Sequence, residues 1–248
     1  KDFAYECEKQ GNFPERIWKQ AAELGFIGTH FPEKHSGGET GMLETVLILE
    51  EFFRKDASIG AALAMASFAS ECILRFGSEA LKEKFLPKVA EGEMLSAGAF
   101  SENLRGGDYT SIKATAGRQN GEWIIDGKKN NVVNGGSAGF YIVLCHTDPD
   151  EQDPKKGISM ILVEGDRPGI SIEAIGRPLG GNVLDRANVN FEEVKVPAEN
   201  LVGKEGSGIS QLKTFLSESK ILAAAQALGI AYGSLDRAMS YTKERVQF

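Results

Sequence analysis

Two short segments hold the residue types that could bind a cofactor. Residues 101–108 read Ser-Glu-Asn-Leu-Arg-Gly-Gly-Asp, and residues 131–136 read Asn-Val-Val-Asn-Gly-Gly. Small residues and a hydroxyl at the end of an element let backbone N–H groups approach an anionic or heteroaromatic ligand. On spacing alone, a tight turn explains the first segment more simply than a binding site does. The second segment is open to the same two interpretations, a tight turn or a binding site.

Other residues with reactive side chains form no recognisable site. His30, His35 and His146 lack the spacing of metal ligands, and no Cys-x-x-Cys motif occurs. Residues 203–208 read Gly-Lys-Glu-Gly-Ser-Gly and resemble a phosphate-binding loop superficially. A connection between a strand and a helix explains these glycines better, because the run does not match a Walker loop.

Charge and cysteine content limit the possible partners and compartment. The 248 residues include 28 Lys and Arg against 35 Asp and Glu, a net charge of −7. Without a clustered basic face, this acidic balance argues against nucleic-acid binding. Cys7, Cys72 and Cys145 are odd in number and far apart, so we expect free thiols in a reducing, cytoplasmic compartment. The longest apolar stretch, residues 59–69, is shorter than the roughly 20 residues of a membrane span, so we expect none.

Helical periodicity dominates the first third of the chain. Apolar residues recur at intervals of three and four, and glycine, proline and serine mark the ends. The pattern predicts helices from Pro14 to Gly25, over residues 42–53, over residues 59–76 as one buried central helix, and from Ser78 to Gly92, where Pro87 bends or shortens the helix.

The middle of the chain has the pattern of β-structure. Residues 112–116 and 123–126 flank Asn120-Gly121, a strong hairpin signal. Further apolar runs predict strands over residues 140–145, 158–163, 170–175 and 187–194. Their spacing predicts an antiparallel barrel or sandwich.

A long amphipathic helix is predicted over residues 209–241 at the end of the chain. Its apolar face has no later element to cover it, so its partners come from another chain or from a longer protein. We therefore expect a multi-domain α+β protein: a helical domain over residues 1–92, a β domain over 93–206, and the first helix of an incomplete helical bundle over 207–248.

In this order, the segments resemble the acyl-CoA dehydrogenase family along the whole chain. Residues 24–28 (Leu-Gly-Phe-Ile-Gly) look like its first turn, and residues 223–231 look like the first helix of its C-terminal bundle. Residues 191–203 (Phe-Glu-Glu-Val-Lys-Val-Pro-Ala-Glu-Asn-Leu-Val-Gly) are close to its exit from the β domain, and this match is long and specific. The resemblance implies FAD between the β domain and the bundle, and oxidation of an acyl-CoA thioester to the 2,3-enoyl-CoA. It further implies electron transfer to an electron-transferring flavoprotein, and a homo- or hetero-oligomer.

The resemblance also assigns site residues, with departures from the family pattern. Cofactor contacts fall on Phe100, Ser101, Gly106, Gly107, Asn131, Val132 and Val133, and contacts to acyl-CoA fall on Gly107 and Lys220. Gly107 stands where the family has a serine, Asn131 where it has a tryptophan, and Val133 where it has a threonine. A third family segment, Ser-Asp-Thr, is Leu-Asp-Arg at 184–186. No catalytic base is assigned, because Ser219 occupies the position that a minority of members use.

Three functions are compatible with these observations. The first is an acyl-CoA dehydrogenase that retains FAD in spite of the lost ring and hydroxyls. The second is a flavin-poor, non-catalytic subunit that pairs with a competent partner. The third is a flavin-dependent monooxygenase on the same fold, in which an open site admits oxygen.

Overall fold

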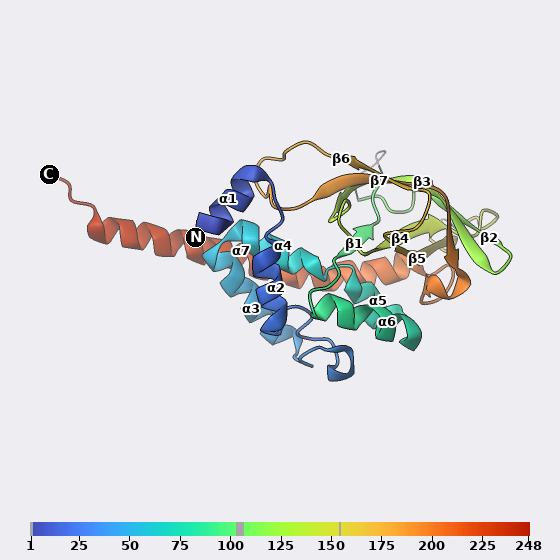
Figure 1. Cartoon of the computed structure of the whole chain (residues 1–248), viewed down its shortest axis with the longest axis horizontal. Helices are drawn as coiled ribbons and strands as arrows, with labels where there is room; N and C mark the ends of the chain where they lie inside the picture. Colours follow the sequence, from blue (N-terminus) through green and yellow to red (C-terminus); the bar gives the residue numbers. More distant parts are fainter. Residues whose placement is uncertain (1, 103–106, 154) are drawn as a thin grey trace.

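The computed structural model describes residues 2–102, 107–153 and 155–248. Short N-terminal helices lie beside a β-sheet, and one long helix runs along both and projects beyond them at its C-terminal end (Figure 1). The helices are α1 (Asp2–Gln10), α2 (Glu15–Glu23), η1 (Glu33–His35), α3 (Met42–Lys55), α4 (Ala57–Ala66), α5 (Ser70–Phe76), α6 (Glu79–Ala90), η2 (Ala198–Asn200) and α7 (Gly208–Glu244). The strands are β1 (Ser96–Ala99), β2 (Thr115–Gln119), β3 (Glu122–Val133), β4 (Phe140–His146), β5 (Ile158–Glu164), β6 (Ile170–Ala174), β7 (Arg186–Pro197) and β8 (Leu201–Val202).

The predicted fold class is confirmed, and most predicted helices are present. Helices α2, α3, α6 and α7 lie where the periodicity places them, whereas α1 was not predicted. The Ser78 hydroxyl accepts a hydrogen bond from the Leu81 N–H at 3.3 Å and so caps α6. Pro87 lies within α6, close to its C-terminal end.

The prediction of a single helix over residues 59–76 was wrong, because the segment is divided into α4 and α5. At the break, the Ser96 hydroxyl accepts from the Ala69 N–H at 3.1 Å and donates to the Ala66 carbonyl at 3.2 Å. The Asn134 side-chain amide donates to the carbonyl of Met65 at 2.9 Å and to that of Ser96 at 3.1 Å. These side chains of the β domain satisfy backbone groups that a continuous helix would pair internally.

Within the described chain, the segment Ala57–Phe76 is long and apolar enough to cross a membrane by length and composition alone. It extends beyond residues 59–69, the longest apolar stretch noted in the sequence. Half of it is buried inside the fold, and the break between α4 and α5 interrupts it. The buried core helices of a folded domain satisfy the same criterion, and Ala62, Ala66 and Cys72 are fully buried here.

The strands form a mixed sheet in the order β6-β7-β3-β2-β4-β5-β8, with β1 beside β4. The hairpin predicted at Asn120-Gly121 is present, since β2 and β3 pair antiparallel and Gln119 faces Glu122. The expectation of a wholly antiparallel arrangement was wrong, because β1 and β2 each run parallel to β4. The β2–β3 hairpin returns the chain to the end of the sheet where β1 begins, so β4 starts in the same direction as β1.

Both faces of the central strand β4 are covered. Phe140, Ile142 and Leu144 join a core shared with the helices, while Tyr141 and Val143 join a second core that lies within the β domain. This arrangement explains why residues 140–145 are apolar without alternation. The sheet is thereby fixed against the helical layer.

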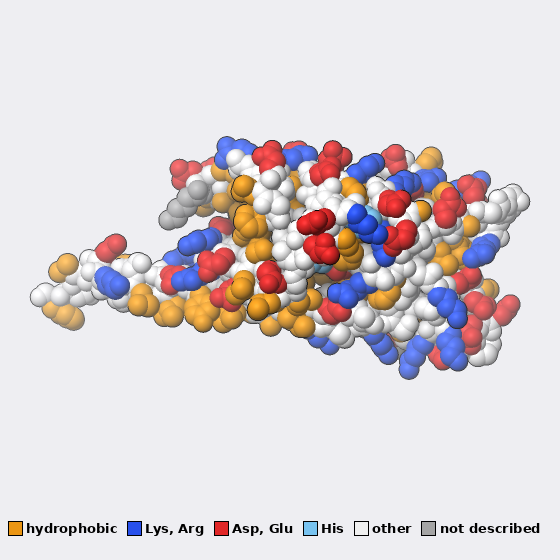
Figure 2. Space-filling model, turned by 90° about the horizontal axis from the view of Figure 1, so that it is seen from below, with side chains coloured by type: hydrophobic (Ala, Val, Ile, Leu, Met, Phe, Trp, Pro, Cys, Tyr) orange, Lys and Arg blue, Asp and Glu red, His pale blue; other side chains and the backbone are white. Residues whose placement is uncertain are grey.

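Helix α7 is buried at its start and exposed along much of its length. Phe215 is buried against the other elements, and a Cβ added at Gly229 or Gly233 would lie 2.3 Å from a backbone carbonyl oxygen of α3. On both sides of this contact, apolar side chains of α7 are exposed: Ile221, Leu228, Leu235, Met239 and Tyr241. They contribute to the apolar band along the projecting helix in Figure 2. The apolar face predicted to lack a partner is therefore uncovered.

Candidate functional site

Hydrogen bonds and an ion pair of Glu102 attach the segment that carries Ser101 to the sheet. The Glu102 carboxylate accepts hydrogen bonds from the Lys113 N–H at 2.7 Å, from the Ala114 N–H at 3.0 Å and from the Lys129 ammonium at 2.7 Å. The Ser101 carbonyl accepts from the Asn130 N–H at 2.9 Å. These contacts place Ser101 beside the end of β3.

Lys129 and Glu102 form a buried ion pair. The Lys129 side chain is 0% exposed and that of Glu102 is 11% exposed. Burial favours the neutral acid, but the Lys129 charge and the three donated hydrogen bonds outweigh it, so the pKa of Glu102 lies below its ordinary value. The sequence did not reveal this pair, because a lysine within a strand is most often solvated.

The end of β3 is irregular where the second predicted cofactor segment begins. The register of β3 against β7 shifts between Lys129 and Val132, and Asn131 has a positive φ of 52°. The Asn131 N–H donates to the Asn188 side-chain oxygen at 3.3 Å, while the Asn131 side chain is exposed. Val132 is buried in the β core, and Val133 is half-buried. The bulge therefore turns the Asn131 side chain out of the sheet.

Asp185 holds the turn that follows β3. Its carboxylate accepts from the Gly136 N–H at 2.8 Å and from the Ser137 hydroxyl at 2.9 Å, and its carbonyl accepts from the Asn134 N–H at 2.6 Å. The run from Gly135 to Gly139 spells Gly-x-Ser-x-Gly, but it leads into strand β4 and not into a helix. It is therefore a structural turn and not a nucleophile elbow.

The predicted site residues are only partly brought together. Ser101 and the start of the 131–133 segment are joined through the Asn130 hydrogen bond. The Phe100 ring is buried and packs edge-on against Phe215, with 5.9 Å between the ring centroids, so the ring is part of the core. Gly107 lies in an exposed turn with φ of 81° and open space around it. Gly106 lies outside the described residues.

Three neighbouring residues of α7, Glu218, Ser219 and Lys220, lie at the positions that bear on substrate contacts and on the base. Lys220 is exposed, and no hydrogen bond or ion pair within the described chain reaches its side chain. Glu218 pairs with Arg75 of α5 at 2.6 Å, and the Ser219 hydroxyl donates to the Phe215 carbonyl at 2.8 Å. Glu218 is thus held toward the helical domain.

These side chains fit the polar edge of a flavin but offer it no stacking surface. Within the described chain, the Ser101 hydroxyl and the Asn131 side-chain amide have no hydrogen-bond partner, so both are free to meet a ligand. The left-handed turn at Gly107 has room for a close approach to its backbone. Neither Asn131 nor Val133 supplies the aromatic plane or the hydroxyl expected at its position.

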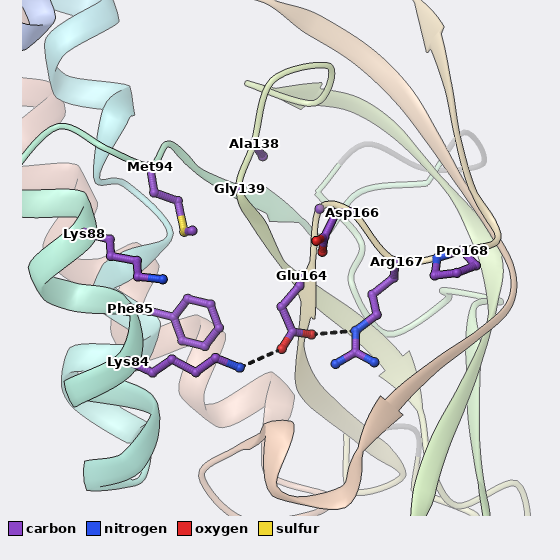
Figure 3. Close-up of a pocket in the computed structure, with 11 residues that line it drawn as sticks. Lys84, Phe85, Lys88, Met94, Ala138, Gly139, Glu164, Asp166, Arg167 and Pro168 are labelled. Carbon is purple, nitrogen blue, oxygen red and sulfur yellow. Dashed lines mark hydrogen bonds and ion pairs between the residues drawn. The ribbon is translucent and has the colours of Figure 1, made fainter.

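A cavity of about 750 Å³ lies elsewhere, between α6 and the turn after β5 (Figure 3). Glu164 connects its two sides, because its carboxylate pairs with Lys84 at 3.0 Å and with Arg167 at 3.0 Å. Phe85 and Met94 form apolar wall, and Asp166 adds a further carboxylate. None of the predicted site residues that the structure describes lines this cavity.

Comparison with known proteins matches both main parts of the chain to one family. Residues 1–93 match the acyl-CoA dehydrogenase N-terminal domain, and residues 97–194 match the acyl-CoA dehydrogenase middle domain. The chain is 36% identical to an acyl-CoA dehydrogenase of Bacillus subtilis over 242 residues, which are 97% of this chain and 63% of that protein. It is 34% identical to the acryloyl-CoA reductase (NADH) of Anaerotignum propionicum, over 99% of this chain and 62% of that protein.

A solved structure shows the same likeness. Butyryl-CoA dehydrogenase from Megasphaera elsdenii superposes with a TM-score of 0.91 and 34% sequence identity, over 98% of this chain and 64% of that chain. The chain therefore spans less than two thirds of the length of these relatives.

Proposed function

The chain belongs to the acyl-CoA dehydrogenase family, and we propose that it forms the first part of an FAD-dependent oxidoreductase. Its reaction would oxidise the α,β carbon–carbon bond of an acyl-CoA thioester to the 2,3-enoyl-CoA. The observation that carries this proposal is the attachment of Ser101 beside the 131–133 segment, in a chain similar to such enzymes along its length. The proposal includes the division of the chain into a helical domain (1–92), a β domain (93–206) and the first helix of a helical bundle (207–248).

The residues of this chain would hold the cofactor through polar contacts and backbone. Ser101 and Asn131 would donate or accept hydrogen bonds at the flavin edge, while Val132 and Val133 would present the end of β3. Gly106 and Gly107 would let the backbone approach a phosphate, and Lys220 would meet the CoA part. FAD, when bound, supplies a two-electron acceptor, and the protein supplies orientation and electrostatics.

Electron transfer and assembly extend this proposal to partners. We expect electrons to leave through an electron-transferring flavoprotein, and we expect a cytoplasmic homo- or hetero-oligomer. A relative whose name includes NADH raises the alternative of a nicotinamide as the electron partner. Single-turnover reduction by acyl-CoA, followed by addition of either acceptor, would separate the two.

Titration of the full-length protein with FAD tests the cofactor. We expect a flavin absorption band and a dissociation constant that falls in the variants Asn131→Trp and Val133→Thr, because each restores a contact worth about 1 kcal/mol. The exposed substitution Lys195→Met on β7, outside the proposed site, is the matched control. A protein that stays colourless with excess FAD, in the parent and in both variants, would contradict the proposal.

A flavin-poor subunit is the second candidate, and the departures at Gly107, Asn131 and Val133 favour it. Such a subunit would co-purify with a flavin-containing homologue and would bind little FAD alone. A yellow homo-oligomer that is reduced by an acyl-CoA would count against it.

A further inference from the structure

We propose that a second cavity, outside the cofactor segments, binds an amphiphilic anion such as a fatty carboxylate. The cavity has a volume of about 530 Å³ and lies where α1, α2, α3 and α4 meet α7. None of the described residues that we propose to contact FAD or CoA lines it. The inference therefore stands independently of the proposed function.

The interior of this cavity is apolar. Ile17 of α2, Phe52 of α3 and Ile59 and Leu63 of α4 line it, and Ala4 of α1 lies at its side. Ile59 and Leu63 are buried, while the other three side chains are partly exposed. An alkyl chain placed here would leave water and cover apolar surface that four helices contribute.

The two carboxylates at the rim are already engaged. Asp236 accepts from the Arg54 guanidinium at 2.7 Å, and Arg54 also donates to Glu51 at 3.0 Å. One oxygen of Asp56 accepts from the Ser58 and Ile59 N–H groups, both at 3.0 Å, and thereby caps α4. Asp56 therefore serves the N-terminus of α4 and not a cationic ligand.

Two cations at the rim, Arg237 and Lys55, form no ion pair within the described chain. Arg237 donates through one nitrogen to the Lys55 carbonyl at 3.0 Å, and within the described chain neither Arg237 nor Lys55 has an ion pair within 4.0 Å. The remaining guanidinium N–H groups of Arg237 form a fork that suits a carboxylate. An apolar interior, with two cations at its mouth that form no ion pair in the described chain, matches a ligand with an alkyl chain and an anionic head.

Calorimetric titration of the chain with decanoate, below its micelle concentration, tests this site. We expect saturable binding of one decanoate, weaker binding of decan-1-ol, and no binding of decylammonium, which would meet Arg237 and Lys55. Equal binding of decanoate and decylammonium would overturn the charge assignment, and the absence of saturable decanoate binding would overturn the site.

Two independent variants locate the ligand. Arg237→Met removes a cation, and Ala4→Phe fills the interior from α1. We expect each to weaken decanoate binding by about fivefold to tenfold, the effect of one partly exposed charged or apolar contact. Lys243→Met, an exposed change near the end of α7, is the matched control, and Lys55→Met replaces Arg237→Met if that variant does not fold. Unchanged affinity in folded Arg237→Met and Ala4→Phe, or a change in Val133→Thr alone, would place decanoate elsewhere and refute the inference.

Discussion

Replacement of Lys129 by methionine tests most directly how the ion pair with Glu102 holds the Ser101 segment to the sheet. Methionine keeps the unbranched stem of the lysine but removes the ammonium that lies 2.7 Å from the Glu102 carboxylate. Glu102 would keep its two backbone donors, Lys113 and Ala114, yet lose its counter-charge in a site where it is only 11% exposed. Loss of one partner of a buried pair costs about 3–5 kcal/mol of the free energy of unfolding, because the other charge stays buried.

An exposed pair in the same chain gives a matched control. Lys34 and Glu79 lie 2.6 Å apart, a distance close to that of the buried pair, but their side chains are 61% and 58% exposed. Solvent screens such a pair, so Lys34→Met should leave the urea midpoint nearly unchanged. Urea unfolding followed by tryptophan fluorescence would measure both variants.

Two outcomes of this comparison would refute the reasoning. One is a midpoint for Lys129→Met that falls no further than that of Lys34→Met. The other is a double variant, Lys129→Met with Glu102→Gln, that is as unstable as Lys129→Met alone. We expect the double variant to recover part of the loss, because an amide leaves no charge buried without a partner.

The same pair predicts a pH dependence. The pKa of Glu102 is lowered from 4.5 in the folded state, so the unfolded chain takes up a proton there first as the pH falls. The stability that Glu102 contributes is complete above its unfolded pKa and disappears as the pH drops through its folded pKa. The difference in midpoint between the parent and Glu102→Gln should therefore be constant above the unfolded pKa of 4.5 and narrow as the pH falls below it. A difference that stays constant below this pKa would contradict the assignment.

Three further perturbations test other parts of the fold. Ser96→Ala leaves two backbone groups at the α4–α5 break unpaired, and we expect a loss of about 1–3 kcal/mol in urea unfolding. Gly233→Ala should lower the melting temperature, because its Cβ would lie 2.3 Å from the Arg54 carbonyl oxygen, while Gly117→Ala, with open space around it, should not. His35 is buried, its ring nitrogens have no partner in the described chain, and burial lowers its pKa from 6.5. Since the unfolded chain is protonated there first, stability should fall as the pH drops below 6.5, and this dependence should be weaker in His35→Phe; equal dependence in both would exclude His35 as its source.

Local sequence patterns predicted most of the elements. Periodicity located α2, α3, α6 and α7, and Asn120-Gly121 located the β2–β3 hairpin. The break between α4 and α5 was not predictable in this way, because the hydroxyl that stabilises it comes from Ser96, 27 residues beyond Ala69. The parallel pairing of β1 and β4 likewise depends on a return of the chain that no local pattern records.

The sequence predicted which residues belong to the candidate site, but it did not predict the contacts that their side chains make. The family pattern pointed to Ser101 and Asn131, and the structure places their segments side by side. The family pattern could not show that Phe100 turns its ring into the core, or that the Lys129 side chain is buried beneath the site. Burial of a charged or aromatic side chain depends on which elements cover it, and that depends on tertiary packing.

The hydrogen bonds from the β domain to the α4–α5 break have a consequence for folding during synthesis. Asn134 donates to the Met65 carbonyl from 69 residues further along the chain, and strands β4 and β5 supply the apolar cover for the same helices. Proteins emerge from the ribosome N-terminus first and fold domain by domain. Until the β domain has been made, Ala57–Phe76 lacks both the groups that divide it and the surface that buries it. We therefore expect Ala57–Phe76 to reach its folded structure only after the β domain has been synthesised.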